Sequence, residues 1–384
     1  MTIVQIVHNP IATSVRQYQR NWEVENYRHR LSATMGFDTC SFDIHGTRDE
    51  IEEFFFSGLG RQVTRYSNDG SYICWQGQIM SLTLTEPGFQ MRVSLNEMFN
   101  RIIVRYIPID TSTNPPTESA ETSTTAVNNA TSQAKYGVKE LIYRPAHITR
   151  LNNADATQQG DILLGQYKEP RRSGQISSGD NEPKLFIECE GYMHTLDWVV
   201  YNQTASSGTD NLNTLIAAVL ATTCGQFVAS SDTSNSTGLS AQKYFNRDDT
   251  GLTVVQTLAS LGDTSLNRWL CNMFDDRKVV YNQSYDINNN VVSYYRSSQN
   301  ERQEIRDLFG RVIPPWELRP GKWIRTMDVF PWYPTPATLP EDYTALYIEA
   351  IDWSEPDSLQ LQGSPGDKLQ VILARQANQG DALL

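Results

Sequence analysis

The sequence predicts a mainly β protein with a small helical insertion, an α+β chain in overall class. Apolar and polar residues alternate at Cys40, Phe42 and Ile44, and again over 80–84 and 91–95. This period of two is typical of half-buried antiparallel strands. The 17 prolines and 23 glycines lie scattered between these runs, which favours turns over long helices. We therefore expect many short strands arranged as barrels or sandwiches.

The first predicted domain covers residues 1–107 and contains a short helix followed by a hairpin. Apolar residues repeat at helical spacing behind two acidic residues that suit a helix N-terminus: Asp49, Glu50, Ile51, Phe54 and Phe55. Gly58 and Gly60 are expected to end this helix. The turn residues over 67–70 then join two β-type runs.

Residues 108–136 are predicted to be a linker rich in Ser, Thr and Pro. Between Thr111 and Ala134 there is no aromatic residue, Leu or Ile, and there is a Pro-Pro pair. Such a segment buries too little apolar surface to offset the entropy lost on ordering, so we expect an extended connection.

A second β-rich domain is expected over 137–208 and 275–384, interrupted by a helical insertion over 209–274. The insertion carries two runs at helical spacing, beginning near Leu212 and Leu252. We also expect a Pro-rich surface loop over 330–340 and a closing strand over 369–374.

Charge and hydropathy exclude several classes of function. The net charge of −12 argues against a dedicated nucleic-acid reader, because phosphate binding depends on clustered Lys and Arg. No apolar run reaches the ~18 residues of a membrane span, and residues 1–10 do not resemble a secretory signal. The five cysteines are odd in number and widely spaced, which predicts buried reduced thiols. We expect assembly in a cytoplasm.

No segment predicts a catalytic, cofactor or metal site. None of the five histidines stands in a G-x-S-x-G or H-E-x-x-H motif. Cys189, Glu190 and His194 are close in sequence, but a strand sends Cys189 and Glu190 to opposite faces and a fourth ligand is missing. A packed thiol and a surface histidine are the simpler interpretation.

An acidic string near the C-terminus admits a calcium site or a glycosidase pair as alternatives to a solvated loop. It consists of Glu349, Asp352, Glu355 and Asp357. Calcium loops need closely spaced oxygen ligands around a glycine turn, and Trp353 and Pro356 interrupt that geometry. A solvated loop is the default interpretation.

Six short motifs, in this order, resemble tail proteins of tailed bacteriophages, in particular hub or tail-tip proteins related to the baseplate hub. They lie over 58–63, 75–79, 100–106, 132–137, 188–192 and 319–324. The framework residues that carry the resemblance are Gly60, Arg61, Trp75, Gly77, Asn100, Arg101, Tyr136, Gly137, Pro320 and Gly321.

The resemblance implies two tube-like β-barrel domains per chain and a homotrimer whose six barrels match a sixfold tail tube. It implies a virion structural protein at the tail tip or baseplate, with no enzymatic activity. The partners would be the tail tube, the distal tail proteins and the tip or fibre proteins. DNA would pass through without specific binding. Some such hubs carry a long C-terminal lysozyme or peptidase extension, which these 384 residues do not resemble, so we do not expect wall-degrading activity.

The sequence is also compatible with three alternative functions. A distal tail protein would form a homohexameric ring in place of a trimer. A carbohydrate-binding or depolymerising tail protein would act through aromatic platforms and the acidic C-terminal residues. An assembly factor would be absent from the finished particle.

Overall fold

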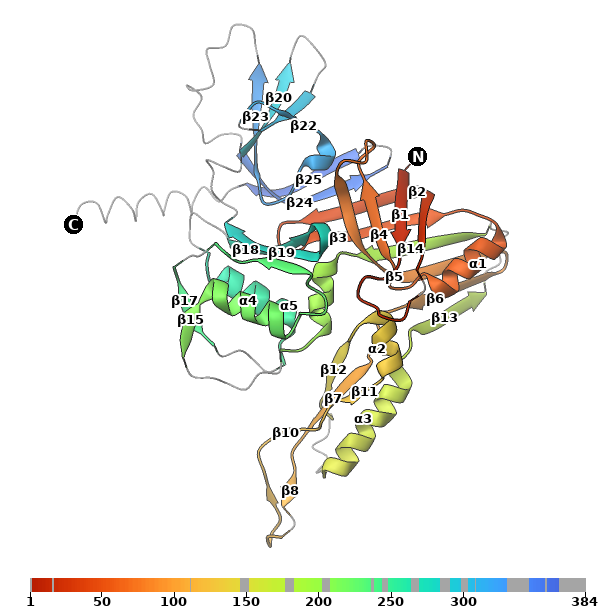
Figure 1. Cartoon of the computed structure of the whole chain (residues 1–384), viewed down its shortest axis with the longest axis vertical. Helices are drawn as coiled ribbons and strands as arrows, with labels where there is room; N and C mark the ends of the chain where they lie inside the picture. Colours follow the sequence, from red (N-terminus) through yellow and green to blue (C-terminus); the bar gives the residue numbers. More distant parts are fainter. Residues whose placement is uncertain are drawn as a thin grey trace, which may run out of the picture.

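The computed structural model describes residues 2–15, 17–110, 112–145, 152–176, 183–201, 208–235, 238–243, 248–263, 269–283, 291–297, 303–307, 309–329, 345–355 and 358–365. Within these residues the protein is mainly β with a smaller helical part, which confirms the predicted fold class. None of the described helices is long and apolar enough to cross a membrane. Figure 1 shows a central β region, a helical subdomain beside it, an arm on one side and further strands on the other.

Six antiparallel strands close a barrel at the centre of the molecule. They are β1 (Thr2–Val7), β2 (Gln19–Ser32), β3 (Gly36–Ile44), β14 (Lys184–Glu190), β5 (Ile73–Glu86) and β4 (Gln62–Tyr66), paired in that order, with β4 returning to β1. The sequence assigned the strand at 184–190 to the second domain. Its pairing with both β3 and β5 makes it part of the first barrel instead.

The barrel core follows the predicted alternation. Cys40, Phe42 and Ile44 are buried inside, and Leu82 and Leu84 join the same core. The predicted hairpin is confirmed by the antiparallel pairing of β4 with β5. The predicted helix is α1 (Arg48–Ser57), which starts at a Thr47 capping box, buries Ile51, Phe54 and Phe55, and ends at Gly58.

Two strands of the barrel, β2 and β5, are each 14 residues long and continue beyond it. The first part of β2 pairs with β1, and its last part pairs with β24 (Ala345–Ser354). The first part of β5 pairs with β4, and its last part pairs with β6 (Phe89–Ser94). Outside these lie β25 (Ser358–Pro365) on β24 and β13 (Arg171–Ile176) on β6.

These pairings form one continuous antiparallel sheet of eight strands, in the order β25, β24, β2, β3, β14, β5, β6 and β13. We call this sheet the ladder. Among the described residues, β25 pairs only with β24, and β13 pairs only with β6. Within the part of the chain that the structure describes, the ladder therefore has two open edges, although the barrel that shares its central strands has none.

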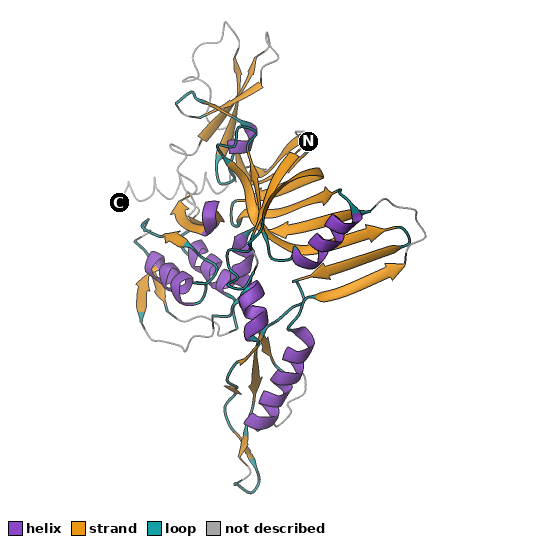
Figure 2. Cartoon of the chain, turned by 45° about the vertical axis from the view of Figure 1, so that its right-hand side comes forward, coloured by secondary structure: helices purple, strands orange, loops and turns teal. Residues whose placement is uncertain are grey.

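An arm projects from the barrel and occupies much of the segment expected to be a linker. Strand β7 (Arg101–Tyr106) pairs with β10 (Thr122–Ser123), β11 (Val127–Asn128) and β12 (Glu140–Tyr143). Helix α2 (Ala130–Tyr136) joins β11 to β12, and α3 (Asn153–Tyr167) lies along the strands (Figure 2). A hairpin of β8 (Ile109–Asp110) and β9 (Thr117–Glu118) extends it.

The linker prediction was wrong because pairing does not require a large apolar content. The two-residue strands β10 and β11 satisfy backbone groups against β7, and Val127 and Tyr136 supply apolar contacts at the end of the segment. Short strands of this kind leave almost no periodic signal in a sequence.

Helices occur at both places where the sequence predicts them within the insertion. Helices α4 (Leu212–Thr222) and α5 (Gly251–Ser260) pack with the 3-10 helix η1 (Tyr192–Trp198). Strands β18 (Trp269–Phe274) and β19 (Lys278–Gln283) form a hairpin across η2 (Asp275–Arg277), with β16 (Ser230–Asp232) parallel to β19. A small β15 (Thr209–Asn211) and β17 (Ser240–Gln242) pair lies beside α4.

The C-terminal strands extend the ladder's β24 into a second sheet. Strands β20 (Val291–Ser297), β21 (Gln303–Arg306), β22 (Val312–Ile313) and β23 (Trp323–Val329) are joined to β24 by the β23 pairing, with η3 (Pro315–Glu317) before β23. No closure of this sheet occurs within the described strands, so a second barrel stays a prediction. The loop expected over 330–340 and the strand expected over 369–374 lie outside the described residues.

Candidate functional site

The ladder has one apolar and one polar face. Its apolar side chains belong to the barrel core, on the side of β1 and β4. The opposite face carries a groove of about 610 Å³. Its charged and hydroxyl lining comes from β2, β3, β5, β6, β14 and β24: Arg28, Arg30, Thr39, Ser41, Ser81, Arg92, Glu188, Glu190, Asp352 and Ser354.

Three arginines and three carboxylates line this groove. The Arg92 guanidinium lies 2.8 Å from the Glu188 carboxylate, and Arg30 lies 3.4 Å from Asp352. Each of these pairs joins neighbouring or next-nearest strands of the ladder. Cross-strand pairs of opposite charge stabilise a sheet modestly when they are exposed to solvent.

Hydroxyl and amide groups fix these charges in place. Ser81 donates a short hydrogen bond to Glu188, and Arg28 Nε donates to Ser41 Oγ at 2.7 Å. Gln362 Nε2 donates to Asp352 Oδ2 at 2.6 Å, and its own Oε1 accepts from Arg30 at 3.0 Å. Each of the three arginines therefore already uses at least one of its donors within the groove.

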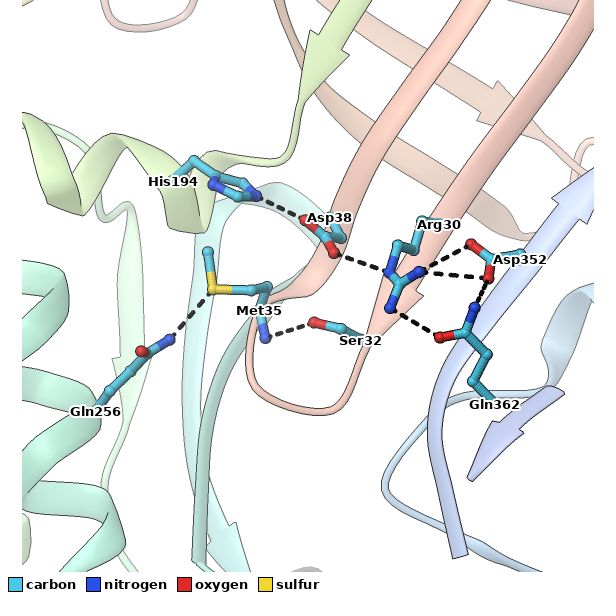
Figure 3. A network of polar contacts seen from close by, with 8 residues as sticks. All are labelled: Arg30, Ser32, Met35, Asp38, His194, Gln256, Asp352 and Gln362. Carbon is cyan, nitrogen blue, oxygen red and sulfur yellow. Dashed lines mark hydrogen bonds and ion pairs between the residues drawn. The ribbon is translucent and has the colours of Figure 1, made fainter. Parts of the chain in front are cut away.

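One end of the groove continues into a polar network that joins three parts of the molecule (Figure 3). Arg30 also lies 3.4 Å from Asp38, whose other oxygen contacts His194 Nε2 at 2.8 Å. These contacts connect β2 and β3 to η1, while Asp352 and Gln362 connect them to β24 and β25. The barrel, the helical subdomain and the C-terminal strands meet here.

His194 is the titratable group of this network. Burial lowers its pKa, but the hydrogen bond that His194 Nε2 donates to Asp38 and the nearby carboxylates outweigh burial and raise the pKa above its ordinary value. The charged imidazolium is thereby favoured as an ion-pair partner of Asp38. Cys189 points into the barrel core, whereas Glu190 lines the groove. The described residues hold no group of three or more His, Cys, Asp and Glu that could bind a metal ion.

A second histidine, His29, lies beside the groove in the barrel wall. It stacks on Trp353 with ring centroids 5.5 Å apart, across the β2 and β24 pairing. Burial and the positive charges of Arg65 and Arg319 hold the pKa of His29 well below its usual range. It is therefore a neutral packing group where the barrel meets the C-terminal strands.

The acidic string expected near the C-terminus is divided between different partners. Asp352 pairs with Arg30, and Glu355 accepts a hydrogen bond from Thr2 Oγ1 at 3.1 Å. Glu349 is half-buried on β24, and Asp357 lies outside the described residues. Strand β24 runs through this segment, so a solvated loop is wrong for residues up to 354.

Four framework residues lie in the barrel. Gly60 has a φ of +75° and donates to the Ile79 carbonyl, while Arg61 Nε donates to the Ser57 carbonyl at 2.9 Å. Trp75 is fully buried, and a Cβ on Gly77 would lie 2.4 Å from its ring and 2.3 Å from the Glu190 carbonyl oxygen. Gly77 thus permits β14 to close the barrel.

Four more framework residues lie at the base of the arm. Asn100 is fully buried; its Nδ2 donates to the Gly137 carbonyl at 2.8 Å, and its Oδ1 accepts from the Lys139 amide at 2.8 Å. Arg101 lies 2.9 Å from Glu140. Tyr136 is buried, and Gly137 has a φ of +86°. These residues fix α2 against β7.

Pro320 and Gly321 form the turn before β23. Gly321 has a φ of +87°, and its amide donates to the Ile348 carbonyl on β24. The adjacent Arg319 donates to the Ile73 carbonyl at 2.7 Å and lies over the Tyr72 ring. The framework residues therefore occupy three separate places, and the structure does not bring them together as one site.

The groove itself was missed by the sequence. Arg28 and Arg30 lie in β2, for which the sequence analysis predicts no strand. Asp38 belongs to no recognisable motif. Alternation of charged residues with Tyr27, His29 and Leu31 is the signal that could have placed both arginines on one face.

Comparisons with known proteins give matches among solved structures only. No protein-family model matches the chain, and no curated protein does. The chain is similar to the 43 kDa tail protein of prophage MuSo2 from Shewanella oneidensis, with a TM-score of 0.42 and 8% identity over 96% of this chain and 98% of that one. It is similar to prophage tail protein gp18 from Listeria monocytogenes EGD-e, with a TM-score of 0.40 and 10% identity over 98% and 99%.

A tail protein from Neisseria meningitidis MC58 matches with a TM-score of 0.37 and 8% identity over 94% of this chain and 96% of that one. The sequence motifs resemble this same class of protein. All three TM-scores lie below 0.5, so the function of this chain has to be argued from its own residues and geometry.

Proposed function

We propose that this chain is a virion structural protein of a phage tail, which forms the hub or tip ring that joins the tail tube to distal tip or fibre proteins. The observation that carries the proposal is the ladder, an eight-stranded sheet with a closed barrel behind it and, at each end, an edge that no other described strand pairs with. In this role the protein would work by assembling with other chains through its surface and strand edges, and not by catalysis.

The two open edges are different strands, so pairing between copies would be head to tail. Such a heterologous contact generates a ring when the rotation closes. Strand β13 is exposed along all six of its residues, and exposed edges of this kind are templates for pairing with another chain. We propose that β13 of one copy pairs with β25 of the next.

The elements that cover one face of the ladder indicate which face would line the ring's channel. Strands β1 and β4 and helix α1 pack on the apolar side of the ladder, and they would fill a bore on that side. The polar face, with its groove, would therefore line the channel. The ordered motifs that resemble hub proteins favour three copies per ring, and a hexamer would favour the distal tail protein.

Stoichiometry tests the proposal directly. Native mass spectrometry and light scattering on the full chain should give three times the 43.5 kDa of one chain. A mass of six chains would favour the distal tail protein over the hub as the function of this chain. A monomer at all concentrations, together with virions in which microscopy finds the protein away from the tail tip, would reject both.

A cross-linking experiment tests the edges. The double variant Ser173→Cys with Gln360→Cys places one exposed thiol on β13 and one on β25, while the five native cysteines are buried. A thiol-specific cross-linker should join chains into dimers and closed trimers. Each single variant is the control and should give no closed species. Equal products from the single variants would contradict the β13 to β25 contact.

A further inference from the structure

The groove on the polar face brings charges of opposite sign together. The whole chain carries a net charge of −12, and the groove is lined by three arginines and three carboxylates. At the chain's ratio of 32 Lys and Arg to 44 Asp and Glu, six charged groups would hold two or three basic ones, so the groove keeps the chain's own balance. The feature that matters is which of these charges are paired.

Two of the three arginines in this groove are paired with carboxylates, whereas Arg28 donates from Nε to Ser41 Oγ. Arg92 lies 2.8 Å from Glu188 and also donates to Ser81 Oγ at 3.4 Å. Arg30 contacts Asp38, Asp352 and Gln362. A guanidinium whose donors already meet a carboxylate has to give up that pair before it can bind a phosphate.

Duplex DNA binds proteins chiefly by counterion release when Lys or Arg neutralises its phosphates. Unpaired arginines along a channel would hold the duplex at each contact. A wall with excess carboxylates would repel it. An arginine paired with a carboxylate does neither, since beyond about one Debye length the field of each charge is cancelled by its neighbour.

We propose that this groove is the DNA-facing wall of the channel and that Glu188 and Asp352 act as masks, which keep Arg92 and Arg30 from binding DNA phosphates. This inference rests on the proposed ring. It assigns the passing ligand as a double-stranded polyanion and names the two carboxylates that weaken its binding to Arg92 and Arg30.

The test unmasks both arginines. In the full-length assembled protein, Glu188→Gln with Asp352→Asn removes two negative charges from the groove. The control, Glu52→Gln with Asp210→Asn, removes two from other surfaces, where they pair with Arg48 and Lys243. Binding of a linear fluorescent DNA duplex is measured between 50 and 200 mM salt, and thermal unfolding verifies that each variant is folded.

We expect the groove variant to gain at least about tenfold in affinity over wild type, with a steep loss of binding as salt rises. The control variant should change by less than about threefold. Equal gains in both variants would reduce the effect to net charge and overturn the inference, as would no gain in the groove variant. If that variant does not fold, Glu188→Gln alone should show a smaller gain in the same direction, and no gain would overturn the inference.

Native mass spectrometry of the same samples separates the two failures. Rings that assemble and show no groove-specific gain would overturn the masking role and leave the proposed hub function standing. Wild-type protein that forms no ring would overturn both.

Discussion

The barrel and the arm are both built on paired strands, yet the barrel closes on itself while the arm's four-stranded sheet is open and covered by α3. The barrel belongs to a large core that reaches from β1 to β25. The arm has a core of five buried residues: Ile102, Val104, Tyr106, Ala156 and Leu164. Strand pairing thus occurs both in a region with a large core of its own and in a region with a very small one.

The difference shows where each region draws its stability. The strands of the barrel hydrogen-bond to one another all the way round, so the barrel does not need other regions to pair its strand edges. Its contacts with those regions can therefore fix how they are oriented. The arm buries little apolar surface, and its base is fixed by buried polar groups such as Asn100 and Lys139, whose ammonium group donates to the Leu95 and Asn96 carbonyls. Small cores of this kind unfold locally before the rest of a protein.

The largest effect is expected in the barrel. Gly77→Ala places a methyl group 2.3 Å from the Glu190 carbonyl oxygen, and backbone has to move to admit it. We expect a loss of about 3 kcal/mol or more in the free energy of unfolding, measured by urea denaturation.

The matched control lies on the open edge of the ladder. Gly174→Ala in β13 meets only ordinary contacts, at 3.4 Å from the Phe89 ring. Its free energy of unfolding should stay within about 1 kcal/mol of wild type. Equal losses in the two variants would contradict the tight closure at Gly77.

A smaller and local effect is expected in the arm. Leu164→Ala removes one of five buried side chains between α3 and β7, at a cost of about 2 to 3 kcal/mol. Hydrogen exchange should rise in α3 and β7 and stay unchanged in the barrel. Ile162→Ala, at a side chain that is 56% exposed, is the control. Faster exchange throughout the barrel would show that the two regions unfold as one.

The contact between barrel and helical subdomain should depend on pH. Because the pKa of His194 is raised in the folded protein, its stabilising contribution is full below the unfolded pKa and falls as pH rises through the folded pKa. The difference in unfolding free energy between wild type and His194→Gln should be larger at pH 6 than at pH 8. If the difference in unfolding free energy were the same at both pH values, the ion pair between His194 and Asp38 would not be its cause.

The smallest effect should be a gain. A Cβ on Gly165 in α3 meets no atom within 4 Å, so Gly165→Ala should stabilise the arm by about 0.5 to 1 kcal/mol through helix propensity. Slower hydrogen exchange confined to α3 is the expected readout. A loss of stability would mean that Gly165 faces a contact with another copy or partner.

Much of the fold could be predicted from alternation and spacing. The strand through Cys40, Phe42 and Ile44, the helix through Phe54 and the insertion helix from Leu212 all carry strong local periods. The role of β14 could not be predicted, because a strand pattern does not tell which strands it pairs with. The short strands of the arm carry too few residues for any period to show.

The groove could not be predicted from the sequence either, because its residues come together only through strand pairing. Its charges come from strands far apart in the chain, with Arg30 and Asp352 separated by more than 300 residues. Only the pairing of β2 with β24 brings them together. The sequence could supply the carboxylate as a candidate but not its partner.

The late position of β14 has a consequence for synthesis. Strand β5 ends at Glu86 and β14 begins at Lys184, so about 100 residues are made between them, which takes roughly 5 to 20 s at the usual rate of translation. During that time the arm can fold from local contacts, while β3 and β5 wait with unpaired edges. A nascent chain stalled before Lys184 would expose both edges at once and would be prone to pair with its neighbours on the same message.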